Sequence, residues 1–139
     1  MVQRAIVLGF AGALLHVFNH AIFKGLLFMG AGAVRHATDT LEIERLGGLL
    51  KRMPWTGVTF VIAAAAISGL PPLNGFISEF LIYAAGFKAS LTPGVHGLLF
   101  GVVTIGAMAL IGGLATACFA KAFGIVFLGE PRSAAASAA

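Results

Sequence analysis

The sequence contains few charged residues. Of its 139 residues only nine are Lys or Arg and five are Asp or Glu, 10% in all, whereas an ordinary soluble domain carries about 25%. At the same time 59% of the residues are hydrophobic and the mean hydropathy is +1.00. A soluble core of this size cannot hide so much apolar surface. The composition therefore excludes an ordinary soluble domain and predicts insertion into a lipid bilayer.

Cysteine and nucleotide-binding motifs are equally scarce. The single Cys118 excludes an intrachain disulfide and lies in an apolar run, where a small hydrophobic residue is the simplest interpretation. The net charge is +4, but the basic residues are scattered singly or flank apolar runs, so we expect no nucleic-acid partner. Phosphate loops, CxxC pairs and nucleophile elbows are missing. We therefore expect no complete active site, no metal site and no cofactor within this chain.

What the sequence does contain is three long apolar runs, residues 5–34, 56–87 and 95–127. At about 1.5 Å of helix per residue, each run is longer than the hydrocarbon core of about 30 Å requires. The predicted fold class is all-α, a polytopic integral membrane helical bundle segment with three spans. Residues 1–132 would form one membrane domain, and the low-complexity tail 133–139 is expected to be disordered.

The second run is interrupted by SGLPPLNG, residues 68–75. Pro71 and Pro72 remove two backbone donors and clash with the preceding turn, so they predict a helix break near mid-membrane. Broken backbone at that depth is tolerated only where it is buried in protein or lines a watery cavity. Glu79 follows the break, where broken-helix transporters hold coupling ions. The alternative is that Glu79 only neutralises charge in an ion pair, for example with Lys24.

A polar connector, residues 35–53, separates the first two runs. Asp39 to Glu42 (DTLE) predicts the N-cap of a short helix, and Gly47-Gly48 predicts its end. Basic residues favour a cytoplasmic location for this side of the membrane. The opposite side holds only Arg4 and Lys88, whereas the connector side holds Arg35, Arg45, Lys51, Arg52 and Arg132.

The first run contains LLHVFNHAIFKGLLF, in which His16, His20 and Lys24 are four residues apart. On a helix they form one stripe roughly 12 Å long. Histidine titrates near neutral pH, and ionisable groups at membrane depth are by default functional. The stripe therefore predicts a proton relay. Two alternatives are bonds to polar atoms of neighbouring helices, and a metal shared by the two histidines, for which no third ligand is evident. Lys121 is a further candidate, equally well explained by snorkelling.

Several linked motifs resemble a known family. HVFNHAIFKGLLFMGAGAV, ERLGGLLKRMP and ISGLPPLNGFISEF are similar to the antiporter-like membrane subunits of respiratory complex I and its relatives. CFAKAFGIVFLGEPRS resembles in particular the large membrane subunit of hydrogenase-4 and formate hydrogenlyase-type complexes. The resemblance runs from about Leu14 to Ser133. It implies a bundle of many helices with two inverted repeats, a broken helix in each, and a hydrated polar axis along the membrane midplane.

The resemblance also implies roles for individual residues. His16, His20 and Lys24 match the relay on the helix before the second broken helix, and Glu79 matches the ionisable residue of that broken helix, where some relatives carry lysine. Lys121 matches a position where relatives often have a basic residue. Family members have many more spans than three, so the resemblance implies that this chain is a fragment, a truncated reading frame or one piece of a split subunit.

The function implied is proton translocation as part of a redox-driven respiratory or hydrogenase complex in the inner membrane of a bacterium or archaeon. The implied partners are the lipid bilayer and other membrane and peripheral subunits of that complex. Two alternatives stay open: a sodium/proton antiporter subunit of the same fold, and a purely structural membrane anchor or non-functional fragment.

Overall fold

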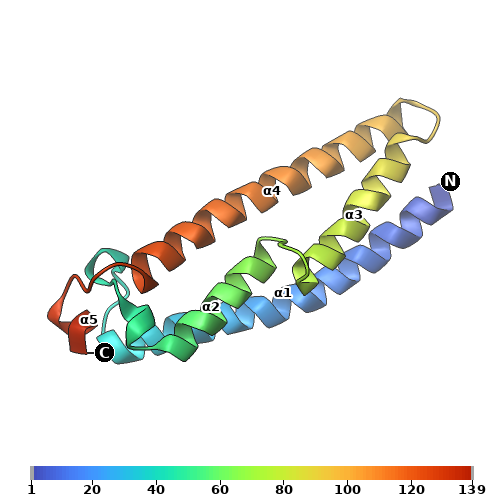
Figure 1. Cartoon of the computed structure of the whole chain (residues 1–139). Coiled ribbons are helices and arrows are strands. Elements are labelled where there is room, and N and C mark those ends of the chain that lie inside the picture. Colours follow the sequence, from blue (N-terminus) through green and yellow to red (C-terminus); the bar gives the residue numbers. More distant parts are fainter. Residues whose placement is uncertain (1, 139) are drawn as a thin grey trace.

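The computed structural model describes residues 2–138, and all regular secondary structure in this part of the chain is helical (Figure 1). Four helices form the body of the molecule, and three shorter helical pieces lie at one end of it. The elements in chain order are α1 (Val2–Thr38), η1 (Ile43–Arg45), η2 (Leu49–Lys51), α2 (Pro54–Ile67), α3 (Asn74–Ser90), α4 (Val95–Phe127) and α5 (Ala134–Ala138).

Helix α1 is longer than the apolar run predicted, because it continues through the polar residues after Val34. It contains no proline, and its 37 residues span roughly 56 Å. At its end the Thr38 hydroxyl donates to the carbonyl of Val34 at 2.8 Å. Asp39 then adopts a left-handed conformation with φ of 52°, and its N–H donates to the carbonyl of Arg35. A left-handed residue after the last turn is a common way to end a helix.

The connector differs from the predicted short α-helix. Asp39 ends α1 rather than capping a new helix, and the following residues form only two 3₁₀ turns, η1 and η2. Gly47 and Gly48 lie between the two turns and pack against the segment after α4. The N–H of Gly48 donates to the carbonyl of Leu128 at 2.9 Å. This tertiary contact holds the two glycines in positive-φ conformations that an α-helix cannot contain.

The second apolar run forms two helices, α2 and α3, with residues 68–73 between them. The interruption contains Pro71 and Pro72, together with Gly69 at a φ of 65°. With 14 and 17 residues, α2 and α3 span roughly 21 and 26 Å, each less than the hydrocarbon core requires. In the described part of the chain, two helices are long and apolar enough to cross a membrane alone, α1 and α4.

Helix α1 is the longest helix of the bundle, and other helices pack along it. Both α2 and α3 pack along it, and α4 packs on the other side of these two helices (Figure 1). Between α1 and α3 the approach is close at Gly12, where an added Cβ would lie 2.9 Å from the Cβ of Leu81. Small residues permit such close helix contacts in membranes. Phe23 and Leu27 of α1 pack against the alanines of α2 and form the core beside the helix break.

A second core cluster lies at the C-terminal end of α1, where Val34 belongs to it. Phe127 is 1% exposed. Its ring stacks on that of Phe123 with centroids 5.3 Å apart, and it is tilted against that of Phe60 at 5.2 Å. The connector contributes Leu46 and Leu49 to this cluster. Here the structure differs from the predicted disordered tail: α5 is helical, and its Ala136 is fully buried in the same cluster. Residue 139 lies outside the described residues.

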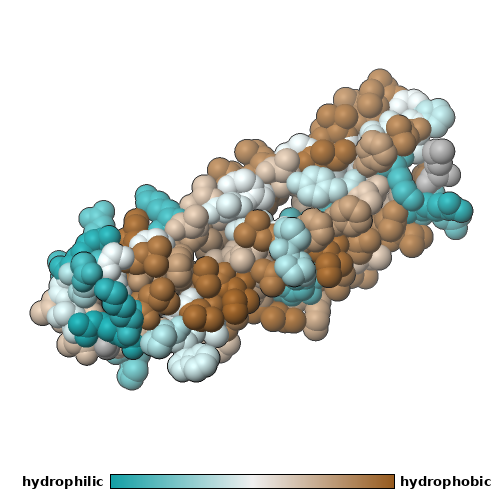
Figure 2. Space-filling model, viewed as in Figure 1, coloured by the Kyte–Doolittle hydropathy of each residue, from teal (hydrophilic) through white to brown (hydrophobic). Residues whose placement is uncertain are grey.

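The outer surface is apolar along most of its length. Figure 2 shows hydrophobic side chains over the middle of the molecule, while hydrophilic ones gather at its two ends. Of the four long helices α4 is the most exposed, since of its residues only Gly101 and Phe127 are buried. Polar ends on an apolar middle are the pattern that a bilayer requires of an embedded bundle.

Candidate functional site

The predicted polar stripe lies on one face of α1, and all three of its members are partly buried. The rings of His16 and His20 are 5.9 Å apart between centroids and tilted by 48°. Phe23 places its ring edge-on to both histidines, at 6.3 Å from His16 and 5.3 Å from His20. The aromatic side chain thus borders both imidazoles in the edge-on geometry that aromatic pairs favour.

Two hydrogen bonds connect this face of α1 to the first two turns of α3. The Nδ1 atom of His16 lies 3.0 Å from the hydroxyl of Ser78, which is fully buried. The side-chain amide of Asn19, 5% exposed, donates to the backbone carbonyl of Asn74 at 2.9 Å. An amide or hydroxyl buried without a partner is costly, so these bonds favour one docking position of α3 on α1.

Lys24 lies further along α1 and faces different neighbours. Its ammonium group is 5.3 Å from the centroid of the Phe28 ring, within the range of a cation–π contact. The side chain lines a small cavity of about 180 Å³ together with Phe60 of α2 and Phe119 of α4. The stripe therefore begins at the junction of α1 with α3 and ends where α1, α2 and α4 meet.

Glu79 lies in the second turn of α3, one residue after Ser78, and is half-buried. Its carboxylate lies directly against Gly69 in the helix break, in the space that a Cβ on Gly69 would occupy. The ion pair with Lys24 that the sequence offered as an alternative is not formed in the part of the chain that the structure describes. The ion pairs found there join Arg45 to Glu42 and Lys51 to Glu130, all at the surface.

The remaining predicted residues are not brought into this group. Lys121 is exposed on α4 and forms no hydrogen bond or ion pair within residues 2–138. Pro71 and Pro72 are exposed in the break itself, where their effect is on the backbone. The structure thus joins His16 to α3 and Glu79 to the break, and it places Lys24 beside α2 and α4.

Sequence reasoning missed two polar residues of this site, Asn19 and Ser78. A signal for each was present: Asn19 lies between the two histidines in HVFNH, and Ser78 directly precedes the glutamate in ISEF. Polar groups in apolar runs must find partners at membrane depth. The need for such partners predicts that Asn19 bonds to the helix carrying Ser78, and that Ser78 bonds to the helix carrying Asn19.

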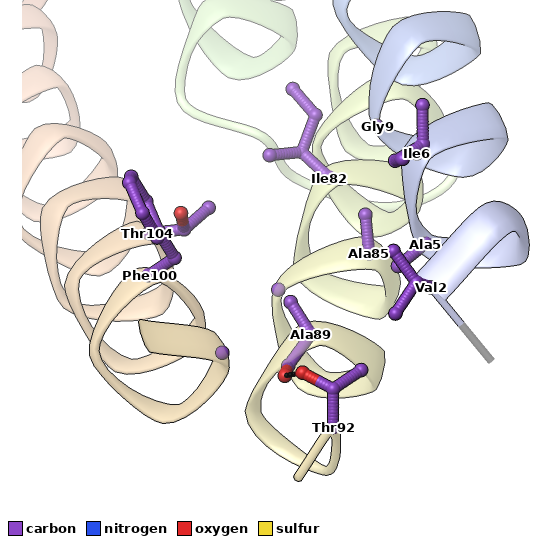
Figure 3. Close-up of a pocket in the computed structure, with 12 residues that line it drawn as sticks. Val2, Ala5, Ile6, Gly9, Ile82, Ala85, Ala89, Thr92, Phe100 and Thr104 are labelled. Atoms are coloured by element: carbon purple, nitrogen blue, oxygen red, sulfur yellow. Dashed lines mark hydrogen bonds between the residues drawn. The ribbon is translucent and has the colours of Figure 1, made fainter. Parts of the chain in front are cut away.

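A larger cavity, of about 330 Å³, lies away from this site, near the beginning of α1. Figure 3 shows Val2, Ile6 and Ile82 along it, with Phe100 of α4 across from them. Its polar groups include the hydroxyl of Thr92, which donates to the carbonyl of Ala89 at 2.6 Å. None of the residues lining this cavity carries an ionisable side chain, so it adds no proton-carrying group to the stripe.

A broken helix docked on a long apolar helix that carries a row of ionisable side chains is an arrangement typical of one class, the membrane transport proteins with a discontinuous helix. Comparison with known proteins specifies the family. The sequence profile described as NADH:quinone oxidoreductase/Mrp antiporter, transmembrane, matches residues 1–107. The chain belongs to this family, which confirms the resemblance drawn from its motifs, and it is a membrane protein.

Three curated relatives show which kinds of protein in this family the chain is similar to. The chain is 49% identical to hydrogenase-4 component B of Escherichia coli (strain K12) over 127 residues, 91% of this chain. It is 42% identical to formate hydrogenlyase subunit 3 of the same organism over 92% of the chain. Subunit A1 of a Na⁺/H⁺ antiporter from Staphylococcus aureus (strain JH9) is 40% identical over 86%. The chain spans only 19%, 21% and 14% of these three proteins, respectively.

Proposed function

We propose that this chain takes part in proton translocation across the membrane, as a portion of an antiporter-like subunit in a redox-driven respiratory or hydrogenase complex. The observation that carries the proposal is the row of His16, His20 and Lys24 on α1, docked through His16 onto the broken helix that bears Glu79. Such a row can accept a proton at one member and release it at the next, with water between them.

In the proposed arrangement the chain crosses the membrane three times. Helices α1 and α4 each cross alone, and α2 with α3 cross together as one broken span. Their combined length of roughly 47 Å exceeds the hydrocarbon thickness, and the break then lies within the membrane. Backbone groups freed at that depth need protein or water around them. The break would therefore supply the hydrated space between Glu79 and the stripe on α1.

The partners proposed are other membrane and peripheral subunits of the same complex, in the inner membrane of a bacterium or archaeon. Two relatives carry the names hydrogenase-4 component B and formate hydrogenlyase subunit 3, which favours a hydrogenase-type complex. Purification of the tagged chain from its native host in mild detergent, with mass spectrometry of what accompanies it, tests this. Hydrogenase or quinone-oxidoreductase subunits are expected; a chain that emerges alone contradicts the assignment.

Lys24 is the residue on which the relay depends most directly, because it is the only lysine in the stripe. Lys24→Ala in the assembled complex should abolish proton translocation while the complex still assembles. The measurement is acidification of inside-out membrane vesicles during turnover. Lys88→Ala is the matched control, since Lys88 lies in the last turn of α3, outside the stripe, and its loss should leave acidification unchanged. Lost assembly with normal translocation per remaining complex would contradict the role.

A second function is favoured by the similarity to subunit A1 of a Na⁺/H⁺ antiporter. In that case the same side chains would serve proton movement coupled to sodium rather than to electron transfer. Replacing sodium with choline in the vesicle assay distinguishes the two. Translocation that disappears without sodium favours the antiporter, and translocation that needs only the electron donor favours the redox-driven complex. If Lys24→Met and Glu79→Gln were both tolerated, the chain would be a structural anchor.

A further inference from the structure

The hydroxyl of Ser78 has more partners than it has hydrogens. It lies 2.9 Å from the backbone carbonyl of Gly75 and 3.0 Å from Nδ1 of His16, while the carbonyl of Asn74 is further away at 3.4 Å and can likewise only accept. A hydroxyl group carries one hydrogen and can accept further bonds through its lone pairs. A carbonyl oxygen can only accept. Both of the shorter contacts are hydrogen bonds at the same time only if Ser78 donates to Gly75 and accepts a hydrogen from Nδ1 of His16.

We infer that Ser78 is a positioning residue that holds His16 with its ring proton on Nδ1, which leaves Nε2 as the nitrogen that gains and loses the relay proton. In the neutral imidazole one nitrogen donates and the other accepts, and the partner of one nitrogen decides the state of the other. When a proton adds at Nε2, the imidazolium keeps its Nδ1–H bond to Ser78. When the proton leaves Nε2, the original tautomer is restored without turning the ring.

The same geometry determines where the proton does not go. A proton that left His16 through Nδ1 would have to pass along the hydroxyl of Ser78, whose own hydrogen is directed to the carbonyl of Gly75. That carbonyl cannot pass a proton on, so the path ends there. Transfer from His16 therefore proceeds through Nε2, and the neighbouring ionisable ring on α1 is that of His20, at a centroid separation of 5.9 Å. Glu79 then exchanges protons with the stripe by another route than Ser78.

The surroundings make this arrangement stable. Ser78 is fully buried between α1 and α3, so water does not compete for its hydroxyl. Asn19 anchors the same turn of α3 through the carbonyl of Asn74, one helical turn along α1 from His16. Phe23 borders the imidazole at 6.3 Å between centroids. The imidazole of His16 is thus bonded to α3 through Ser78 and bordered on α1 by Phe23.

The tautomer can be measured directly, without an assay of transport. The full chain is labelled with ¹⁵N,¹³C-histidine, reconstituted into phosphatidylethanolamine/phosphatidylglycerol bilayers, and studied by magic-angle-spinning NMR at alkaline pH, where imidazoles are neutral. The chain has four histidines, and the spectrum of His16→Gln identifies the signals of His16. We expect His16 to be protonated at Nδ1 and bare at Nε2. A wild-type His16 protonated at Nε2 overturns the inference.

Ser78→Ala removes the acceptor, so the signal of His16 should change to the form protonated at Nε2. The control is Ser90→Ala, because Ser90 lies on the same helix and makes the same kind of bond, to the carbonyl of Phe87 at 2.8 Å, without touching a histidine. The control should leave the spectrum of His16 unchanged. An unchanged tautomer in Ser78→Ala also overturns the inference. Should Ser78→Ala not fold, Ser78→Cys keeps the side-chain shape with a weaker acceptor and is read in the same way.

The role of the fixed tautomer in transport rests on the proposed function, but the tautomer itself does not. If His16 is protonated at Nδ1 but the complex with Lys24→Ala pumps normally, the inference about Ser78 holds and the relay is refuted. If His16 is protonated at Nε2 and Lys24→Ala inactivates the complex, the relay holds and the role of Ser78 is refuted. The two experiments therefore fail independently.

Discussion

At the scale of single residues, Gly69 provides the space in which the carboxylate of Glu79 lies. Gly69 has no side chain, and the space that a Cβ would fill is occupied by the carboxylate of Glu79. Its φ of 65° lies in the left-handed region that glycine adopts without strain. One residue thus turns the chain at the break and leaves room for the carboxylate beside the backbone.

Gly69→Ala should displace the carboxylate of Glu79 and lower proton translocation. Left-handed backbone costs an alanine about 1–2 kcal/mol, so some stability is lost as well. Gly94→Ala is the control, because Gly94 also has a positive φ, 104°, but nothing lies within 4 Å of its added Cβ. Thermal unfolding in detergent and vesicle acidification are measured for both. Equal effects of the two variants on translocation would argue against a specific contact between Gly69 and Glu79.

At the scale of elements, α4 has one buried residue near each of its ends. Near its beginning Gly101 packs against α3, and at its end Phe127 fills the cluster formed with α1 and the connector. Most of the helix between these contacts is exposed. The aromatic cluster of Phe60, Phe123 and Phe127 therefore contributes to the attachment of α4 to α2 at this end of the bundle.

Phe127→Ala should lower the free energy of unfolding by about 3–5 kcal/mol, since a large buried ring is replaced by a cavity. Phe100→Ala on the same helix is the matched control, because Phe100 is 72% exposed, and a surface substitution changes stability by only about 0.5 kcal/mol. Unfolding in mixed micelles by chemical denaturant measures both. Similar losses for the two variants would mean that the cluster does not hold α4.

At the scale of the whole molecule, the two ends of the bundle differ in charge. The connector, the end of α1 and the C-terminal segment lie together at one end, while Arg4 and Lys88 lie at the other (Figure 1). Positive residues near short loops favour the cytoplasmic side. With α2 and α3 crossing together, the connector would be cytoplasmic and the turn between α3 and α4 would face outward.

Two exposed leucines can report this topology, Leu41 in the connector and Leu91 after α3. In a Cys118→Ala background, Leu91→Cys should react with a membrane-impermeant maleimide added to intact cells or spheroplasts. Leu41→Cys should react only after the membrane is permeabilised. Labelling of both from the same side would contradict a crossing by α2 and α3, and the reverse pattern would contradict the assigned orientation.

The sequence by itself determined the helical class, the long apolar runs and the interruption at the two prolines. These features depend on local chemistry, namely apolar length, missing donors and the rigidity of proline. It also determined that His16, His20 and Lys24 share a face, because the period of an α-helix fixes that relation. The family resemblance followed from the same stretches and was confirmed by the comparisons.

Only the tertiary structure decided which groups meet across helices. The bond from His16 to Ser78 joins residues 62 positions apart, and no local pattern specifies it. The connector was predicted as a helix but forms 3₁₀ turns, because Gly47 and Gly48 pack against the segment after α4. The tail is helical because Ala136 packs, fully buried, in the cluster around Phe127. Each outcome depends on a partner distant in sequence, and packing against that partner overrides local preference.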